Sequence, residues 1–267
     1  MFRTRLISSI ILMAITLSVL LLGGDLLFVV LNVIALIGMM ELNRVVKVHK
    51  SAPGILSYIV SIIFYLLIYL DWREYETMLF ILFLMVLMAI YVFGFPKFKT
   101  EQIATSFLGV FYVGVMLSYI YQVRQLPNGE ILVWLIFIGA WGSDTFAYCT
   151  GMLIGKHKIA PKLSPKKSLE GCIGGVVGAA LLGGIFAAIL HPLINGINQP
   201  EIIFAIVGAA SSVISQIGDL AASAIKRNHD VKDYGTLIPG HGGILDRFDS
   251  IIFTAPIVYY LLEFIIK

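Results

Sequence analysis

Long apolar segments dominate this chain, and they constrain its fold more than any other feature. Hydrophobic residues make up 59% of the 267 residues and charged residues only 13%, whereas a soluble domain is about one quarter charged. A helix needs about 20 residues to cross a hydrocarbon core about 30 Å thick. Segments near that length predict an all-α, polytopic membrane helical bundle with about nine transmembrane helices, at residues 6–24, 26–43, 54–70, 78–95, 103–123, 131–155, 171–190, 202–225 and 249–266.

The first segment follows Arg3 and Arg5, as the apolar core of a signal peptide would. It is long for that class and lacks an obvious small-x-small cleavage site. The next apolar segment follows after only a tight turn at Asp25. We therefore expect it to be retained as the first helix.

Basic residues are strongly biased to one side of the predicted bundle. With the N-terminus in the cytoplasm, all of the 19 Lys and Arg residues except Arg73, Arg124 and Lys267 lie on the inner side. Inner loops of membrane proteins carry such an excess of Lys and Arg. The bias predicts an integral protein of the inner (cytoplasmic) membrane, with its C-terminus outside and with cytoplasmic loops at 156–170 and 226–248.

The two halves of the chain differ in polarity. Residues 1–125 form about five apolar spans with few ionisable groups, whereas residues 126–267 contain carboxylates within spans and long basic loops. We therefore expect a structural N-terminal half and a catalytic C-terminal half with its active site facing the cytoplasm. Cys149 and Cys172 have no cysteine or histidine neighbour at ligand spacing, so neither a zinc site nor a disulfide framework is expected.

Two carboxylates lie deep in predicted spans. At the helical rise, Asp144 lies roughly 15 Å below the inner end of its span and Asp219 roughly 10 Å below its own. An intramembrane carboxylate costs several kcal/mol unless it is paired, binds a cation or faces water. The similar depths suggest one shared polar pocket.

Asp219 belongs to a polar stripe with helical spacing, formed by Ser212, Ser215, Gln216, Asp219, Ser223 and Lys226. One interpretation is a functional face. The other is a set of hydrogen bonds to a neighbouring helix, as Ser and Gln often make in membranes.

Asp246 and Asp249 stand one helical turn apart at the start of the last span. One of them, Asp249 in particular, is a candidate N-cap. With Asp144 and Asp219 they make four carboxylates whose mutual repulsion would be relieved by bound cations. Carboxylate oxygens suit Mg²⁺, which proteins commonly hold with one or two carboxylates while phosphates complete its shell. A site for two cations is an alternative to a site for one, and the identity of the second cation, divalent or monovalent, is left open.

Basic residues and glycines provide the opposite charge. The loop at 156–170 contains Lys156, Lys158, Lys162, Lys166 and Lys167, of which the first three are also explained by topology alone. The Pro-Gly-His-Gly-Gly stretch at 239–243 offers backbone N–H groups that can approach phosphate closely. His229 and His241 are each equally well explained as polar loop residues. Together these groups are typical of phosphoryl or nucleotidyl transfer, and the GxxxxGK[ST] loop of an ordinary P-loop ATPase is absent.

The sequence at 223–250, SAIKRNHDVKDYGTLIPGHGGILDRFDS, resembles the signature of the phosphatidate cytidylyltransferases, also called CDP-diglyceride synthases. The matching positions are Ser223, Lys226, Arg227, Lys232, Asp233, Pro239, His241, Gly242, Gly243, Asp246, Arg247 and Asp249. The stretches at 143–148, 155–171 and 216–223 are similar to the companion motifs of the family. The resemblance is specific over 131–267.

The resemblance implies a reaction of CTP with phosphatidate that requires magnesium and gives CDP-diacylglycerol and pyrophosphate. It implies that Asp219, Asp246 and Asp249 hold metal, with Asp144 as a direct or indirect ligand. Lys226 would serve in catalysis, and the substrates would be bound by Ser223, Arg227, Lys166, Lys167, Ser168, Lys232, Asp233, His241, Gly242, Gly243 and Arg247. The partners expected are CTP, phosphatidate and the bilayer, and no nucleic acid.

Other readings of the same residues remain. A secondary transporter would explain Asp144 and Asp219, but no internal repeat accompanies them. A CDP-alcohol phosphotransferase would need a DxxDGxxAR core, and Ser250 follows Asp249 instead. A lipid or polyprenol kinase would present a similar set of ligands. The glycines Gly171, Gly174, Gly175 and Gly178 suit helix packing within the chain or in a homodimer.

Overall fold

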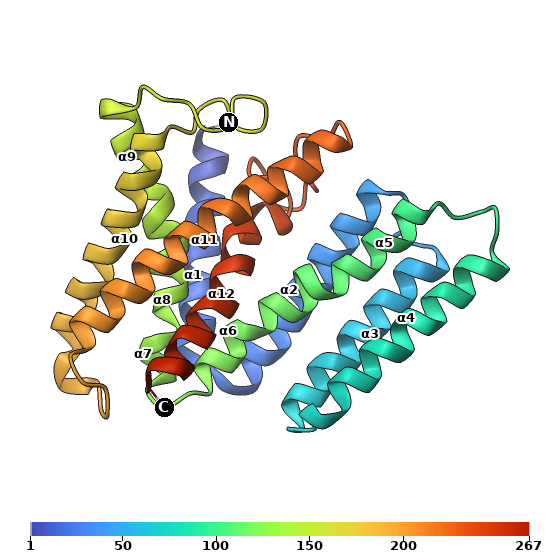
Figure 1. Cartoon of the computed structure of the whole chain (residues 1–267), viewed down its shortest axis with the longest axis horizontal. Coiled ribbons are helices and arrows are strands. Elements are labelled where there is room, and N and C mark those ends of the chain that lie inside the picture. The colour runs from blue at the N-terminus through green and yellow to red at the C-terminus, as the bar shows by residue number, and fades with distance from the viewer. Residues whose placement is uncertain (1, 267) are drawn as a thin grey trace. The chain divides into compact units, whose positions relative to one another are not determined.

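The computed structural model describes the backbone of residues 2–266 and the side chains of residues 7–265. Within this part the chain is helical and contains no strand, as Figure 1 shows. The predicted all-α fold is therefore confirmed. The side chains of Arg3, Arg5 and Lys267, which contribute to the predicted topology, lie outside the described residues.

The helices follow the predicted spans closely. They are α1 (Phe2–Leu22), α2 (Gly24–Val45), α3 (Ala52–Tyr69), α4 (Glu76–Phe93), α5 (Thr100–Gly109), α6 (Met116–Arg124), α7 (Gly129–Leu132), α8 (Trp134–Phe137), α9 (Ser143–Ile154), α10 (Leu169–Leu190), α11 (Pro200–Asn228) and α12 (Leu245–Ile266). Short 3₁₀ turns lie at η1 (Arg73–Tyr75) and η4 (His191–Leu193), and π-helical turns at η2 (Val110–Val115) and η3 (Ile138–Gly142).

Among the described residues, eight helical segments are long and apolar enough to cross a membrane. They correspond to the second to ninth predicted spans, so a polytopic membrane protein is confirmed. The first predicted span coincides with α1, whose described apolar part, Ile7–Leu22, is shorter than the other eight. Only Gly23 separates α1 from α2, and its φ of 62° makes the predicted tight turn. The orientation of the termini stays a prediction.

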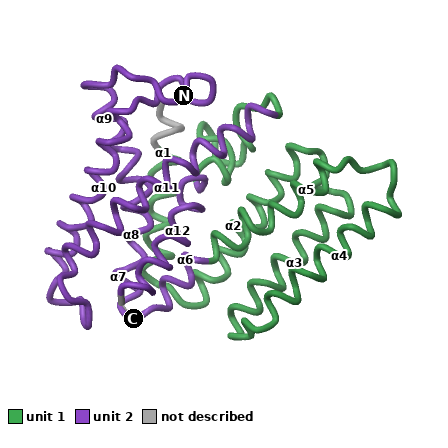
Figure 2. The backbone as a smooth tube through the Cα atoms, viewed as in Figure 1, with its two compact units in different colours: residues 1–118, 229–247 green, residues 119–228, 248–267 purple. Residues whose placement is uncertain are grey.

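The helices form two compact units, coloured separately in Figure 2. Unit 1 contains residues 1–118 and 229–247, and unit 2 contains residues 119–228 and 248–267. The loop before α12 therefore belongs to the same unit as the N-terminal helices, although the sequence places it in the catalytic half. The predicted functional division at residue 125 stays a prediction.

A buried polar network holds three helices of unit 1 together. The Asn43 side chain on α2 donates from Nδ2 to Ser57 Oγ on α3, at 3.1 Å. Its Oδ1 accepts from Ser106 Oγ on α5, at 3.3 Å. All three side chains are fully buried. Because a buried amide must find partners, this network specifies how α2, α3 and α5 pack.

Glycines allow close packing of three helices in unit 2. On α10, Gly174 lies against Thr150 and Gly178 against Phe146, both on α9. On the side of α10 that faces α11, Gly183 lies against the carbonyl of Phe204. In return, Gly208 of α11 lies against the carbonyl of Ala179 on α10. The predicted glycine cluster thus packs helices within the chain, as small residues do in membranes, and the homodimer stays a prediction.

The glycine packing can be tested with two adjacent positions on α10. A Cβ at residue 183 would overlap the Phe204 carbonyl oxygen, whereas a Cβ at residue 184 would meet its nearest atoms at 3.5 and 3.7 Å. We expect Gly183→Ala to destabilise the protein by about 1–3 kcal/mol, because α10 and α11 must separate. Gly184→Ala should be neutral or slightly stabilising, because Ala favours the helix. Thermal unfolding in detergent measures both, and equal midpoints for the two variants would contradict this account.

Candidate active site

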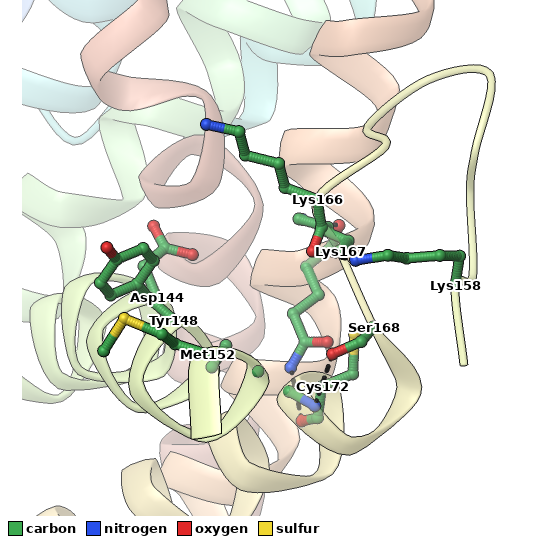
Figure 3. A pocket seen from close by; sticks show the side chains of 12 residues that line it. Asp144, Tyr148, Met152, Lys158, Lys166, Lys167, Ser168 and Cys172 are labelled. Carbon is green, nitrogen blue, oxygen red and sulfur yellow. Dashed lines mark hydrogen bonds between the residues drawn. The ribbon is translucent and has the colours of Figure 1, made fainter. Parts of the chain in front are cut away.

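A pocket of about 440 Å³ opens in unit 2 between α9, α10, α11 and the loop that joins α9 to α10. We call it the lysine pocket, because Lys158, Lys166 and Lys167 of this loop line it. Figure 3 shows Asp144, Tyr148 and Met152 of α9 on the side opposite to these lysines. Its volume lies within the range of about 300–1,000 Å³ that is usual for small-molecule sites.

Asp144 is positioned by an irregular turn that the sequence pattern does not reveal. The π-helical turn η3 ends at Gly142, directly before Ser143 and Asp144. Gly139 within it has no side chain and lies against Ser211 of α11. One residue past the turn, Ser143 Oγ accepts a hydrogen bond from Ser212 Oγ at 2.7 Å. Inserted π turns are frequent at functional sites, and this one fixes where the exposed Asp144 side chain enters the pocket.

We call the loop that joins α9 to α10, residues 155–168, the basic loop. Glu170, at the start of α10, folds this loop back on itself. The Glu170 carboxylate accepts hydrogen bonds from Lys156 N at 3.0 Å and His157 N at 3.2 Å, and it contacts His157 Nδ1 at 2.6 Å. The two arms of the loop also pair, through Ile159 N donating to Lys167 O at 3.3 Å. The loop is therefore ordered by its own contacts, and topology alone does not require such order.

Ser168 has a structural role that sequence reasoning missed. Its Oγ accepts a hydrogen bond from Gly171 N at 3.2 Å and so caps α10. The side chain also lines the lysine pocket. The predicted contact between Ser168 and phosphate stays a prediction. The capping hydrogen bond is a second, structural role of the same side chain.

An ion pair links the basic loop to the predicted carboxylates. Lys167 Nζ lies 2.5 Å from Asp219 Oδ2, with side chains that are only 21% and 30% exposed. Asp249 on α12 interacts electrostatically with Asp219, with Lys226 and with Asp144. Three of the four predicted carboxylates, and the predicted catalytic Lys226, therefore gather in one region of unit 2.

The polar stripe on α11 combines both interpretations offered by the sequence. Ser212 bonds Ser143, and Gln216 Nε2 donates to Cys172 O at 3.1 Å, so these two residues join α11 to its neighbours. Asp219, one turn further along, faces Lys167 instead. Ser223 and Lys226 follow on half-buried positions, and Arg227 is exposed in the last turn of α11.

A second pocket, of about 490 Å³, lies in unit 1 within the loop before α12. We call this segment, residues 229–244, the glycine loop. A turn closes it: Gly240 has a φ of 80° and His241 N donates to Ile238 O at 2.9 Å, which is the position of glycine in a type II turn after proline. The pocket lining includes five predicted substrate-binding residues: Lys232, Asp233, His241, Gly242 and Arg247.

Asp246 is buried and holds the glycine loop together. Its side chain is in the first turn of α12, and the residue is only 7% exposed. Its Oδ2 accepts hydrogen bonds from Tyr234 N at 2.8 Å and from Gly243 N at 2.9 Å. The predicted metal role of Asp246 stays a prediction, and the structure adds a role in closing the loop.

Glu41 on α2 is a site residue that sequence reasoning missed. The residue is 2% exposed, and its carboxylate accepts hydrogen bonds from Ile244 N at 3.1 Å and Leu245 N at 2.9 Å. It therefore caps α12, a role for which the sequence offered Asp249 as one candidate. The sequence signal is a carboxylate within an apolar span, but nothing in the sequence shows which backbone it meets.

The carboxylates of unit 2 fit a cation by their chemistry. Among the described residues, no three His, Cys, Asp or Glu side chains converge closely enough to enclose an ion. Magnesium does not require such a cage, since one or two carboxylates plus substrate phosphates suffice. The Lys167 ammonium against Asp219 shows that this region attracts positive charge.

The sequence model of the cytidylyltransferase family matches residues 3–265. The chain belongs to the cytidylyltransferase family. It is therefore a membrane-embedded nucleotidyltransferase, as the carboxylates and lysines predict, and the family resemblance seen in the sequence is confirmed.

Three similar proteins share one name. The chain is 35% identical over 263 residues to the phosphatidate cytidylyltransferase of Staphylococcus haemolyticus, a match that covers 97% of this chain and 98% of that protein. It is 33% identical over 267 residues to the phosphatidate cytidylyltransferase of Staphylococcus aureus, with the same coverage. It is 39% identical to that of Bacillus subtilis over 166 residues, which is 62% of this chain and 60% of that protein.

The ion pair between Lys167 and Asp219 can be tested by chemical labelling. We expect Asp219→Asn to raise the rate at which an amine-reactive ester acylates Lys167 severalfold, because the ammonium loses its partner and moves into water. Lys162, which is exposed in the same loop, serves as the internal control and should react equally in both proteins. Peptide mass spectrometry measures both lysines. An unchanged rate at Lys167 would show that the pair does not persist in the membrane.

Proposed function

We propose that this protein transfers CMP from CTP to phosphatidate, giving CDP-diacylglycerol and pyrophosphate, at the cytoplasmic face of the inner membrane. The observation that carries the proposal is the end-to-end similarity to proteins named phosphatidate cytidylyltransferase, at 35% identity over 97% of the chain. The lysine pocket supports it, because three lysines and a carboxylate group meet there beside apolar spans.

The reaction brings two anions together, so charge neutralisation is the main task of the site. A phosphate oxygen of the lipid attacks the α-phosphorus of CTP and forms a new P–O bond. The bond between the α-phosphorus and the oxygen that bridges the α- and β-phosphates breaks. Pyrophosphate leaves with that electron pair. A phosphate monoester is already ionised near neutral pH, so no side chain needs to remove a proton. Positioning and electrostatic stabilisation then supply the catalysis.

The basic residues of the proposed site come from the basic loop, from the end of α11 and from the glycine loop with the start of α12. Lys166 and Lys167 would contact the triphosphate from the basic loop, and Lys226 would neutralise charge beside Asp219 and Asp249. Residues of the glycine loop would bind phosphate with side chains and with backbone N–H groups. Ser223, Arg227, Lys232, Asp233, His241, Gly242, Gly243 and Arg247 complete the proposed substrate-binding set.

We propose that Asp219 and Asp249, with Asp144 directly or through water, hold magnesium, and that a second cation of unassigned identity assists. The role of Asp246 as a further ligand is carried over from the sequence. A divalent cation at these carboxylates would neutralise phosphate charge as the substrates approach. For that to happen the Lys167 ammonium must leave Asp219, which would free it for the triphosphate.

The reaction itself is tested with purified protein, CTP, magnesium and a lipid acceptor. We expect pyrophosphate release with phosphatidate and none with diacylglycerol or a polyprenol, because only phosphatidate carries the attacking phosphate. A lipid or polyprenol kinase would give the reverse pattern, with CDP rather than pyrophosphate as the second product. Omission of magnesium should abolish turnover.

The carboxylate roles are tested by substitutions that keep size and hydrogen bonding. Asp219→Asn and Asp246→Asn should fold and lose at least about 100-fold in kcat, the usual effect of removing a key electrostatic group. Asp230→Asn is the matched control: Asp230 is exposed in the glycine loop with a φ of 54°, a conformation that Asn tolerates. The control should retain wild-type activity. Full activity and unchanged magnesium dependence in either test variant would remove that residue from the metal site.

A further inference from the structure

Two buried carboxylates in unit 1 together accept four backbone hydrogen bonds. Glu41 of α2 accepts from Ile244 N and Leu245 N. Asp246 of α12 accepts from Tyr234 N and Gly243 N. Every donor lies in the glycine loop or in the residue that starts α12. The loop is therefore held at Tyr234 and at its C-terminal end by charge-assisted hydrogen bonds, which are roughly twice as strong as neutral ones.

Capping α12 in this way requires the burial of a charged side chain from another helix. A local Ser, Thr, Asp or Asn at the N-cap would satisfy the same N–H groups. Glu41 instead brings a carboxylate from another helix, buries it to 2% exposure, and lies close enough to Asp246 for the two charges to repel. Arg44 offsets part of that repulsion. Like charges that are held together against repulsion and desolvation are found often at functional sites.

Glycines of the loop make room for Glu41. A Cβ at Gly235 or at Gly243 would overlap the carboxylate oxygens of Glu41. On α2 itself, Gly38 lies one turn earlier, where a Cβ would meet Leu245 Cδ1 at 3.8 Å. The glycines at 235 and 243 thus permit the close approach of the Glu41 carboxylate, in addition to any approach to phosphate.

We infer that Glu41 is a positioning residue for the nucleotidyl transfer. It fixes the first turn of α12 and the adjacent arm of the glycine loop, and through them it sets where the carboxylate of Asp246 and the lining of the glycine-loop pocket lie. The inference rests on the proposed function, because it assigns Glu41 to the same reaction. Glu41 contacts no substrate in this account, and its effect passes through the backbone at residues 243–245.

The chain offers a matched structural control on the same helix. Asn43 is two residues from Glu41, is fully buried and holds α2 to α3 and α5 through Ser57 and Ser106. These hydrogen bonds do not involve the glycine loop. Asn43→Ala should therefore destabilise unit 1 without moving the loop, whereas Glu41→Gln should disturb the loop specifically. The Gln side chain has one acceptor oxygen, and its NH₂ group would face the second N–H donor.

The first measurement separates kcat from KM. We expect E41Q to lower kcat at least tenfold and to change the KM values for CTP and phosphatidate less than threefold, because the reacting groups are misplaced while most binding contacts remain. N43A should stay within twofold of the wild-type kcat per folded molecule, although its unfolding midpoint falls. Equal losses of kcat in the two variants would overturn the inference, since Glu41 would then act only through stability.

The second measurement follows the backbone directly and needs no turnover. Hydrogen–deuterium exchange of the amides at 243–245 should rise at least fivefold in E41Q and remain at the wild-type rate in N43A. Unchanged exchange in E41Q would overturn the inference, as would faster exchange with undiminished kcat. If E41Q does not fold, E41D takes its place: its carboxylate is one methylene shorter, so it cannot hold both N–H groups, and the same two effects are expected.

The two hypotheses fail in different ways. A folded wild-type protein that releases no pyrophosphate from CTP and phosphatidate would refute the proposed function. Normal wild-type turnover combined with an unimpaired E41Q variant would refute only the role of Glu41.

Discussion

Carboxylates near the ends of apolar spans are the feature on which the rest of this structure depends. Each costs several kcal/mol in a membrane unless it is compensated, and the chain compensates them in two ways. In unit 1, Glu41 and Asp246 accept backbone N–H groups of the glycine loop. In unit 2, Asp219 pairs with Lys167. The first solution satisfies the carboxylates with backbone N–H groups, whereas the second satisfies a carboxylate with a side-chain ammonium.

Close helix packing in unit 2 serves this chemistry. Glycines on α10 and α11 let the backbone of each helix contact carbonyl groups of the other. Gly139 in the π turn allows the segment before α9 to pack against Ser211. The polar part of α11 can then bond α9 and α10 through Ser212 and Gln216 while Asp219 remains directed to the basic loop. The lysine pocket thus lies among three helices whose close spacing is set by the glycines at their contacts.

Much of the candidate site could be predicted from sequence, because charged residues within apolar spans and clustered lysines are visible without the fold. Asp144, Asp219 and Asp249 stand out as carboxylates in apolar spans, and the structure does bring their charges together. The lysines of the basic loop stand out as clustered charge, and three of them line one pocket. Glu41 gives the same signal, but it stands near Arg44 at the end of a span, where charge is also expected from topology. Its capping of α12 is a contact with residues about 200 positions away in sequence, and no spacing rule predicts such a contact.

The sequence alone determined that this chain is an all-helical membrane protein, where nearly every span lies, and which charged residues, apart from Glu41, are candidates for the site. It could do so because apolar length and the cost of intramembrane charge act on each segment separately. Only the tertiary structure decided that Glu41 caps α12, that Asp246 closes the glycine loop, that Ser168 caps α10, and that the glycines pack helices within the chain. Those facts depend on which backbone N–H or carbonyl groups meet a given side chain, and that is known only once the helices have packed.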